Sequence, residues 1–523
     1  MINKNHTEIL AQTKMQSLPG ELRRLMTSFE EVQEQVLLDI LRYSENTEFG
    51  IANGFAQIKN PEEYRRKFPI TEYKDYKEAV VRMENGEADI LFPGKAESFV
   101  VTTGTTGAFK NIPESAEGAK VKEIVGRLRT AEIVRMAPRI LMPGHNILAI
   151  TNPSVCGRTR GGIPIGTASG QAAGRGPMAE KMTLPEILLT DTEMSSESLD
   201  YLTAAFAAAD RDIALLVCNN IAQFDRIMRL LNTQCSRILC DIKTGRLSVP
   251  LPEKSAQEIQ RLWKEKAACG RAEELENIYR RDGKFTVKAL WPKFSITVCW
   301  LSGSVGRTAR EFRKDFPEDT MFLDWGYGAS EGKFNIPVTP ETSEGYPAIF
   351  GLFFELLPEG SSETVLLHEA QPGIKYELVI TSYSGLYRYN MHDMVTVARD
   401  KNGIPMITFL CKSKDRVEIN GKSFYSSDLI QIIEEYESDR KVFFRLIQGE
   451  KIQRKFRLYA EPDGNVDAAD FENYISEKLK EKNIEQTEVV WKEDGYRNSM
   501  LTEVVAQGKS LVSTKLPVFI RQK

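Results

Sequence analysis

The chain has 523 residues and a formal net charge of −4, from 69 Lys and Arg residues against 73 Asp and Glu residues. With 41% hydrophobic and 27% charged residues it can bury a large core, and its length favours several packed units over one small module. The near-balance of charge creates no overall field that attracts nucleic acid or anionic lipid. We therefore expect neither as a partner, and we expect any phosphate group to be bound by a local site.

Cysteine and histidine usage excludes two further classes of protein. The seven cysteines form no CxxC motif and there are only four histidines, so the sequence predicts neither a disulfide framework nor a zinc site. The first twenty residues lack the apolar core of a signal peptide, and apolar runs such as 213–218 are too short to cross a bilayer. We expect a cytoplasmic protein with reduced thiols and no membrane association; its oligomeric state is open, with a monomer favoured.

The first part of the chain is predicted to be helical. Residues 19–43 place apolar side chains at steps of three and four, which predicts one long amphipathic helix. A second helix is predicted to begin at Pro61 and to end near Phe68. A third is predicted over 73–84, stopping at Asn85-Gly86.

From residue 98 onward, short β-rich runs alternate with helical segments. The predicted strands are 99–102, 147–151, 213–217, 296–300, 321–323 and 378–381. This alternation predicts an α/β body. The Gly, Ala and Ser-rich stretch 151–176 is either a flexible surface loop or backbone that lies close to a ligand, and both interpretations stay open.

The pattern changes again near residue 411. A helix to about Glu437, a hairpin of 442–448 and 455–461 about Gly449, and a helix from Asp467 to Lys482 are predicted. The expected fold is therefore a large multi-layer α/β body, residues 1–410, with a helical N-terminal extension. A small mobile α+β domain, residues 411–523, is expected to be hinged to it near Lys414 and Asp415.

A segment rich in glycine and threonine, residues 102–110 (TTGTTGAFK), follows the first predicted strand. Its glycines let the backbone amides face inward, its threonines offer hydroxyl donors and its lysine can pair with phosphate charge. These residues are Thr102, Thr103, Gly104, Thr105, Thr106, Gly107 and Lys110. The segment does not match the GxxxxGK[ST] pattern, so we predict a polyphosphate loop of another kind, with a hydroxyl-rich surface turn as the alternative.

A second segment, residues 325–332 (WGYGASEG), also follows a predicted strand. The Tyr327 ring can stack on a purine, the Ser330 hydroxyl can reach a phosphate oxygen and the Glu331 carboxylate can hold Mg²⁺. The same letters spell GxSxG, the nucleophile elbow of α/β hydrolases. That elbow needs a helix directly afterwards, which Pro337 and Pro340 forbid, so a serine hydrolase is disfavoured and a plain structural turn is the other alternative.

A third segment, residues 385–393 (GLYRYNMHD), ends at the start of a predicted strand. The carboxylate of Asp393 can accept hydrogen bonds from both hydroxyls of a ribose. An aspartate that only caps a turn is the alternative.

In their order and spacing, these segments resemble the motifs of the adenylate-forming enzymes, which include acyl-CoA synthetases, luciferases and the adenylation domains of peptide synthetases. TTGTTGAFK resembles their phosphate loop, YGASE their adenine and Mg²⁺ motif, and CKSKDRVEINGK (411–422) their hinge and domain-crossing loop. Within this superfamily the chain resembles the acyl acid amido synthetases of the plant auxin-responsive Gretchen Hagen family. That likeness rests on EEVQEQVLLDILRYSENTEFG, FPITEYKDYKEAVVRMENGE and LYRYNMHD, and it continues to STKLP near the carboxyl end.

The resemblance implies ATP and Mg²⁺ as cofactors and a role for each matching residue. The loop 102–107 and Lys110 would bind the ATP phosphates, and Tyr327 and Gly328 would lie at adenine beside Ser302 and Gly303. Ser330 would touch the α-phosphate, Glu331 would hold Mg²⁺, Asp393 would hold the ribose, and Lys422 would contact the nucleotide from the hinge segment. Lys515 would neutralise the α-phosphate, so that Lys515, Glu331 and Lys110 are the implied catalytic residues. The family's arginine and glycine in the ribose motif are Asn390 and His392 here.

The reaction implied by the resemblance begins with a small carboxylic acid, which ATP converts into an acyl adenylate. The acyl group is then transferred to an amino acid or a related amine, which forms an amide and releases AMP; pyrophosphate leaves in the first step. An acyl-CoA ligase with the same first step stays open as an alternative, and so does a catalytically inactive nucleotide-binding protein. The sequence does not identify the acid.

Overall fold

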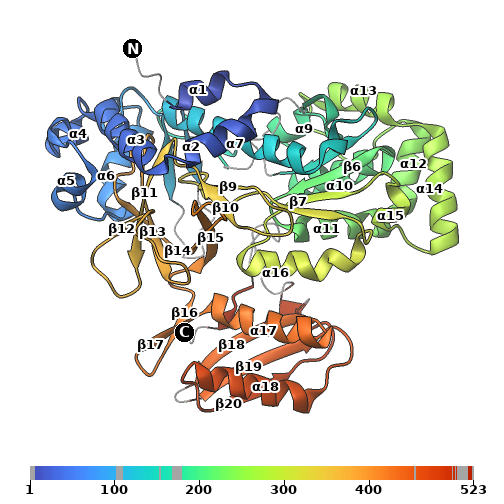
Figure 1. Ribbon diagram of the computed structural model, residues 1–523. Helices are drawn as coiled ribbons and strands as arrows, with labels where there is room; N and C mark the ends of the chain where they lie inside the picture. Colours follow the sequence, from blue (N-terminus) through green and yellow to red (C-terminus); the bar gives the residue numbers. More distant parts are fainter. Residues whose placement is uncertain are drawn as a thin grey trace. The chain divides into compact units, whose positions relative to one another are not determined.

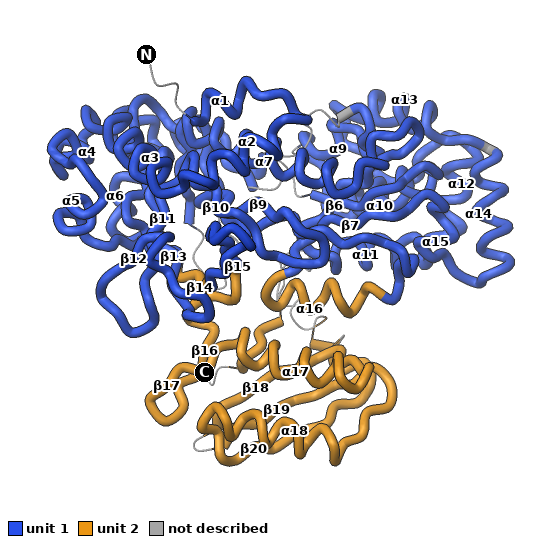
Figure 2. The backbone as a smooth tube through the Cα atoms, in the orientation of Figure 1, with its two compact units in different colours: residues 1–301, 314–391, 396–408 blue, residues 302–313, 392–395, 409–523 orange. Residues whose placement is uncertain are grey.

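The computed structural model describes residues 6–101, 110–151, 155–167, 179–191, 193–452, 455–497, 499–500, 502 and 516–520. The chain forms two compact units (Figure 2). The first unit contains residues 1–301, 314–391 and 396–408, and the second contains residues 302–313, 392–395 and 409–523.

The first unit begins with helices. They are α1 (His6–Gln12), η1 (Met15–Ser17), α2 (Leu18–Met26), α3 (Phe29–Ser44), α4 (Glu48–Ala52), η2 (Phe55–Gln57), α5 (Pro61–Lys67) and α6 (Tyr73–Glu84). The predictions for α5 and α6 are confirmed. The single long helix predicted over 19–43 is wrong, because the helix breaks between α2 and α3. There the Thr27 hydroxyl donates a 2.7 Å hydrogen bond to the Arg24 carbonyl, and Ser28 leaves the helical backbone conformation with φ −126° and ψ 39°.

A parallel sheet forms the centre of the next part of the unit. Its strands are β3 (Asn146–Ile150), β6 (Ile213–Cys218), β7 (Ile296–Cys299) and β8 (Met321–Asp324), in the order β3-β6-β7-β8. Its neighbouring strands are parallel, so all of them end at the same edge of the sheet. Figure 1 shows helices gathered around β6 and β7. These helices are α10 (Ser196–Ala209), α11 (Ile221–Thr233), α12 (Cys235–Thr244), α13 (Ala256–Lys266), α14 (Cys269–Asp282) and α15 (Val287–Leu290).

Two further sheets complete the first unit. One has the order β2-β1-β5-β4, with β1 (Ser98–Val101), β2 (Asn111–Glu114), β4 (Gly157–Arg158) and β5 (Pro164–Gly166). The long helix α7 (Ala116–Met136) directly follows β2. Three short helices come later in the chain: η3 (Pro138–Leu141), η4 (Ala179–Lys181) and α9 (Ile187–Thr190).

The other sheet has the order β12-β11-β13-β14-β15-β10-β9. Its strands are β9 (Asn335–Pro337), β10 (Gly345–Pro347), β11 (Leu352–Pro358), β12 (Val365–Leu366), β13 (Lys375–Ser382), β14 (Tyr389–Arg399) and β15 (Pro405–Lys412). All six strands predicted from the sequence are present, within a few residues of their expected bounds. The prediction of an α/β body with a helical N-terminal extension is therefore confirmed.

The second unit has its own core. It contains α16 (Gly303–Phe312), followed in the chain by η5 (Arg313–Asp315), and then β16 (Arg416–Ile419), β17 (Lys422–Tyr425), α17 (Ser426–Arg440), β18 (Phe444–Ile452), β19 (Lys455–Pro462), α18 (Ala468–Glu481), β20 (Thr487–Trp491) and β21 (Phe519–Ile520). The strand order is β20-β19-β18-β21, and apolar residues of α17 and α18, such as Ile433 and Phe471, form one cluster with the sheet. The small α+β fold and the helix beginning at Asp467 are confirmed, with the Asp467 side chain accepting from the Asp470 amide.

The predicted position of Gly449 at the hairpin turn is wrong, because Gly449 lies inside β18 and pairs with Leu458 of β19. A side chain at Gly449 would collide with Phe456 and would press on Phe519. The glycine therefore permits close packing of the two aromatic rings instead of forming the turn.

Among the residues that the structure describes, no helix has the length and apolar character of a membrane span.

Candidate functional site

The segment after β8 folds back on itself as a narrow hairpin-like loop, residues 326–335. Gly328 bridges to Lys333, and the Ala329 amide donates a 2.9 Å hydrogen bond to the Gly332 carbonyl. Ser330 and Glu331 therefore lie at the tip of this loop, which we call the 326–335 hairpin. The chain continues as strand β9 and not as a helix, so the nucleophile elbow is excluded as predicted.

The tip of the hairpin contacts the strand that precedes the predicted phosphate loop. The Ser330 hydroxyl donates a 3.1 Å hydrogen bond to the carbonyl of Val101, the last residue of β1. Thr102, Thr103, Gly104, Thr105, Thr106 and Gly107 come next in the chain and lie outside the described residues. The second motif is thus bonded to the strand residue that directly precedes the first motif in the chain.

Lys110 and Glu331 are both near one tyrosine, Tyr73. The Lys110 ammonium lies 5.2 Å from the centroid of the Tyr73 ring. The Tyr73 hydroxyl donates to the Asn111 carbonyl at 3.2 Å. Burial raises the pKa of Tyr73, and the carboxylates of Glu84 and Glu331 raise it further. The structure therefore brings the predicted phosphate-binding lysine and the predicted Mg²⁺-binding carboxylate into one neighbourhood.

Helix α7 supports the hairpin tip through Lys122. The Lys122 ammonium donates a 3.1 Å hydrogen bond to the Ser330 carbonyl and forms an ion pair with the buried Glu114, which accepts a 2.6 Å hydrogen bond from Ser384. The Lys333 ammonium donates to the Lys122 carbonyl at 2.9 Å. Burial, assisted by the charges of Arg129 and Lys122, lowers the pKa of Lys333 to about 7.

Helix α7 also supports the base of the hairpin through Arg129. This guanidinium is buried and donates hydrogen bonds to the Tyr327 carbonyl at 2.8 Å and to the Asn335 carbonyl at 2.8 and 3.0 Å. The Asn335 side chain accepts a 2.7 Å hydrogen bond from the Tyr327 amide, and the Tyr327 ring packs on Phe334 with their centroids 4.7 Å apart. Burial lowers the pKa of Arg129 to about 10.

The end of β8 holds the start of the hairpin. The Asp324 carboxylate accepts 2.6 Å hydrogen bonds from the amides of Gly326 and Leu301. Burial raises the pKa of Asp324 to about 6 in spite of these bonds. Asp324 thereby joins the ends of two neighbouring parallel strands to the hairpin.

Sequence analysis did not single out the supporting residues Glu114, Lys122, Arg129, Asp324 and Asn335. Lys122 and Arg129 lie about two helical turns apart, which places them on one face of α7. Charged residues on a helix face normally predict a solvated surface, so this spacing indicates a shared face but not a buried one.

In the ribose motif, Asp393 is buried and forms an ion pair with Lys412. His392 has φ 51°, so the chain keeps a left-handed conformation at the position where the family has glycine. The Asn390 side chain donates a 2.6 Å hydrogen bond to Glu377, so it is engaged within its own sheet.

The other predicted site residues fall in different parts of the chain. Ser302 precedes helix α16 at its N-cap position without a capping hydrogen bond from its side chain, Gly303 begins the helix with φ 59°, and Lys422 is the exposed first residue of β17. Together with Asp393 these residues belong to the second compact unit, and their role at a common nucleotide site stays a prediction. Lys515 lies outside the described residues.

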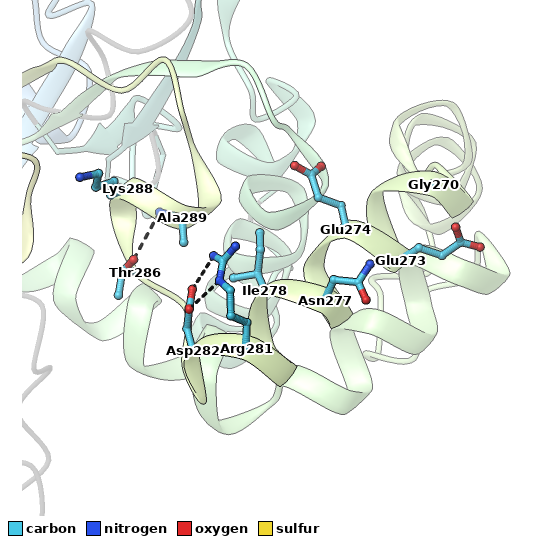
Figure 3. Close-up of a pocket in the computed structure, with 10 residues that line it drawn as sticks. All are labelled: Gly270, Glu273, Glu274, Asn277, Ile278, Arg281, Asp282, Thr286, Lys288 and Ala289. Carbon is cyan, nitrogen blue, oxygen red and sulfur yellow. Dashed lines mark hydrogen bonds and ion pairs between the residues drawn. The ribbon is translucent and has the colours of Figure 1, made fainter.

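Two cavities help to locate the site. One, of about 10 Å³, lies behind the hairpin tip and is lined by Lys122, Glu331, Lys333 and Ser382 among others, which leaves room for about one water molecule. The other is a surface groove of about 770 Å³ along α14 and α15 (Figure 3). In this groove Arg281 pairs with the adjacent Asp282, and none of the sequence motifs contributes a lining residue. The hairpin and its surroundings are therefore the better candidate.

No group of three or more His, Cys, Asp and Glu side chains is arranged to hold a metal ion in the described part of the chain.

Solved structures share this fold. The GH3.15 acyl acid amido synthetase superposes with a TM-score of 0.80 at 19% sequence identity, covering 97% of this chain and 94% of that chain. AtGH3.15 in complex with 2,4-DB gives a TM-score of 0.81 at 18% identity, with 98% and 95% coverage. A 2-hydroxyisobutyryl-CoA ligase in the postadenylation state gives 0.53 at 12% identity, with 94% and 89% coverage. The chain therefore shares the fold of the GH3.15 acyl acid amido synthetase, and more distantly that of the 2-hydroxyisobutyryl-CoA ligase.

Comparison of the sequence with family models assigns the protein to a family. A model described as the GH3 family N-terminal domain matches residues 19–321, and one described as the GH3 family central domain matches residues 347–412. The protein belongs to the GH3 family, which confirms the membership predicted from its motifs. Its relatives include the putative indole-3-acetic acid-amido synthetase GH3.9 of Arabidopsis thaliana, 25% identical over 439 residues, 76% of this chain and 72% of that protein. The jasmonoyl-L-amino acid synthetase JAR6 of Nicotiana attenuata is 23% identical over 429 residues, 77% of this chain and 72% of that protein.

Proposed function

We propose that this protein is an ATP-dependent acyl acid amido synthetase. It adenylates a small carboxylic acid and transfers the acyl group to an amino acid or a related amine, releasing pyrophosphate and AMP. The names of its GH3 relatives support the amide product, because the Arabidopsis protein is named as a putative indole-3-acetic acid-amido synthetase and the Nicotiana protein as a jasmonoyl-L-amino acid synthetase.

The observation that carries the proposal is the hydrogen bond between Ser330 and Val101. It attaches the tip of the 326–335 hairpin to the strand that leads directly into the threonine-rich loop. In this proposal the phosphate chain is bound by that loop and by Lys110 and extends to Ser330 and Glu331. This is the arrangement that attack on an α-phosphate requires, because the reacting phosphorus and the groups that neutralise it must be held together.

A carboxylate is a poor acyl donor because its leaving group would be oxide, so activation as a mixed anhydride with AMP comes first. The carboxylate oxygen attacks the α-phosphorus, the bond to the bridging oxygen breaks, and pyrophosphate leaves. Lys110 and the loop amides stabilise the negative charge that accumulates on the phosphoryl oxygens, and the Ser330 hydroxyl joins them when it turns from the Val101 carbonyl to the phosphate. An amine then attacks the acyl carbonyl, loses a proton, and expels AMP to give the amide.

The surroundings of Glu331 suit Mg²⁺. Mg²⁺ is usually held by one or two carboxylates together with substrate phosphates and water, and not by a cage of protein ligands. Glu331 presents one carboxylate at a hairpin tip beside the predicted phosphate loop, which agrees with that preference. When bound, Mg²⁺ supplies neutralising charge to the phosphates.

In this proposal residues 1–410 are the adenylation domain and residues 411–523 are a mobile lid. The lid turns near Lys414 and Asp415, brings Lys515 to the α-phosphate for adenylation, and withdraws it before the amine enters. Ser302, Gly303, Asp393 and Lys422 complete the nucleotide site around the base, the ribose and the hinge. We also propose that the protein is a monomer and that it acts in the cytoplasm.

The nearest competing function is an acyl-CoA ligase, since a CoA ligase shares the fold. An acceptor assay separates the two. The protein is incubated with ATP, Mg²⁺ and a panel of carboxylic acids, first alone to measure pyrophosphate exchange, and then with amino acids or with CoA. The proposal expects exchange with some acids and an amide product. If exchange occurs but acyl-CoA is the only product, the protein is an acyl-CoA ligase instead. If no acid supports exchange, the protein is an inactive nucleotide-binding protein.

A further inference from the structure

Arg129 is a buried cation bound to main-chain carbonyls. Its residue is 4% exposed, and its hydrogen-bond partners among the described residues are the carbonyls of Tyr327 and Asn335. The Asp324 carboxylate influences the guanidinium through its charge. Burying a guanidinium without a bonded carboxylate is costly, and here its hydrogen bonds to main-chain carbonyls offset part of that cost. What the charge provides here is a fixed position for two carbonyl groups.

One of those two carbonyls belongs to Tyr327, whose peptide group is fixed from both sides. The Tyr327 amide donates to the Asn335 side chain at 2.7 Å, while its carbonyl accepts from Arg129 at 2.8 Å and from the Phe334 amide at 2.9 Å. A backbone fixed at both its donor and its acceptor sets the direction of the Cα–Cβ bond, and the packing of the ring on Phe334 then limits where the ring can lie.

Because Gly326 has no side chain, the Arg129 guanidinium can approach the hairpin closely. Its φ of 91° favours glycine, and an added Cβ atom would lie 2.5 Å from the Arg129 guanidinium. Any side chain at residue 326 would therefore displace Arg129 from the Tyr327 carbonyl.

We propose that Arg129 is a positioning residue for nucleotide recognition: it binds the Tyr327 carbonyl and thereby fixes the ring that receives adenine. The inference rests on the proposed function, in which Tyr327 stacks on the base. Arg129 itself does not contact the nucleotide. Its loss therefore weakens the part of ATP binding that depends on adenine and leaves the part that depends on the phosphates.

Helix α7 offers a matched control in Arg127. This arginine also binds main-chain carbonyls, donating to Ala11 at 2.6 Å and to Thr13 at 2.8 Å, but these lie in the N-terminal helical segment. Arg127→Gln therefore removes the same kind of bond from the same helix without touching the hairpin.

The experiment measures the Kd of ATP and of inorganic tripolyphosphate by calorimetry for the wild type, Arg129→Gln, Arg129→Lys and Arg127→Gln. Circular dichroism first identifies a temperature at which every variant is folded. Because a base that stacks on an aromatic ring adds to the affinity for ATP, Arg129→Gln is expected to weaken ATP binding about tenfold and tripolyphosphate binding by less than about twofold. Arg129→Lys, which keeps a cationic donor, is expected to recover part of the loss, and Arg127→Gln to change neither Kd.

Three results would overturn the inference and leave the proposed function standing. Arg129→Gln and Arg127→Gln could weaken ATP binding equally, or Arg129→Gln could weaken the binding of ATP and of tripolyphosphate equally. The third result is that Arg129→Gln leaves the Kd of ATP unchanged. If Arg129→Gln does not fold, Gly326→Ala takes its place, since it displaces the guanidinium without removing the charge. Selective loss of ATP affinity in Gly326→Ala supports the inference, and wild-type affinity overturns it. A wild-type protein that binds no ATP would overturn the proposed function and the inference together.

Discussion

The Ser330 hydroxyl donates a 3.1 Å hydrogen bond to the Val101 carbonyl, across 229 positions of sequence. Val101 ends the strand that feeds the threonine-rich loop, and Ser330 stands at the tip of the hairpin that carries Glu331. The strand that precedes the first motif is thus bonded to the second motif, although the two are far apart in the sequence.

Glu331→Gln should abolish most of the adenylation activity. The substitution removes the negative charge that we propose holds Mg²⁺ while keeping the shape of the side chain, and loss of one such electrostatic group lowers kcat by about 100-fold or more. Pyrophosphate exchange measures the effect. Glu84→Gln is the matched control, because Glu84 also lies near Tyr73 but outside the hairpin, and its activity should stay close to that of the wild type. Equal activities of the two variants would contradict a role of Glu331 in the reaction.

Lys122→Met should destabilise the fold by about 3–5 kcal/mol, because it leaves the carboxylate of Glu114 buried without its cation. Urea denaturation measures the loss. The double variant with Glu114→Gln should recover a large part of it, since no buried charge then remains unpaired. Lys120→Met serves as the control: its ion pair with Glu117 is more exposed, and such a pair contributes less than about 1 kcal/mol. A single variant as stable as the double variant would contradict the prediction.

Asp324 should make stability depend on pH between about 4 and 6. Its pKa is raised from 3.8 to about 6 in the fold, so over this range the folded protein binds more protons than the unfolded chain. The free energy of unfolding contributed by Asp324 is therefore greatest at low pH and falls as the pH rises, by about 3 kcal/mol in total.

The measurement compares the free energy of unfolding of the wild type and of Asp324→Asn at several pH values from 4 to 7, so that the other carboxylates cancel. The free energy of unfolding of Asp324→Asn, relative to that of the wild type, should increase as the pH rises. Asp319→Asn, at an exposed position of the same region, provides the baseline. A wild type that gains stability over Asp324→Asn with rising pH would reverse the sign and refute the assignment.

His392→Gly should change stability by less than about 1 kcal/mol, whereas His392→Val should lower it by about 1–3 kcal/mol. Residue 392 has φ 51°, a conformation open to glycine and costly for a β-branched side chain. Thermal unfolding compares the two variants with the wild type. If valine were tolerated as well as glycine, the left-handed backbone at this position would not be a constraint on the ribose motif.

The elements predicted well are those whose signals are local. Helix α6 ends where Asn85-Gly86 interrupts it, and it begins with a reciprocal cap between Glu72 and Asp75. The strands of the α/β body are short apolar runs between polar turns, and each appears close to its predicted bounds. Family membership followed from short motifs whose chemistry is carried by neighbouring residues.

The elements predicted poorly are those where a local signal competes with a distant contact. Gly449 indicated a turn, but it lies within a strand because Phe456 and Phe519 need the space that a side chain would occupy. The break between α2 and α3 lies where the Thr27 hydroxyl bonds to a helix carbonyl and Ser28 leaves the helical conformation. The apolar residues keep their steps of three and four across this break, so their periodicity does not register it.

By itself, the sequence determined the class of fold, the order of the motifs and the residue types available for binding ATP, because each depends on residues that are neighbours in the chain. Only the tertiary structure decided that Arg129 is buried and which carbonyls it meets, since its partners Tyr327 and Asn335 lie 198 and 206 positions away. A cation on a helix looks the same in sequence whether water or a hairpin covers it. Burial is a property of long-range packing, and that packing turns an ordinary arginine into a support for the candidate site.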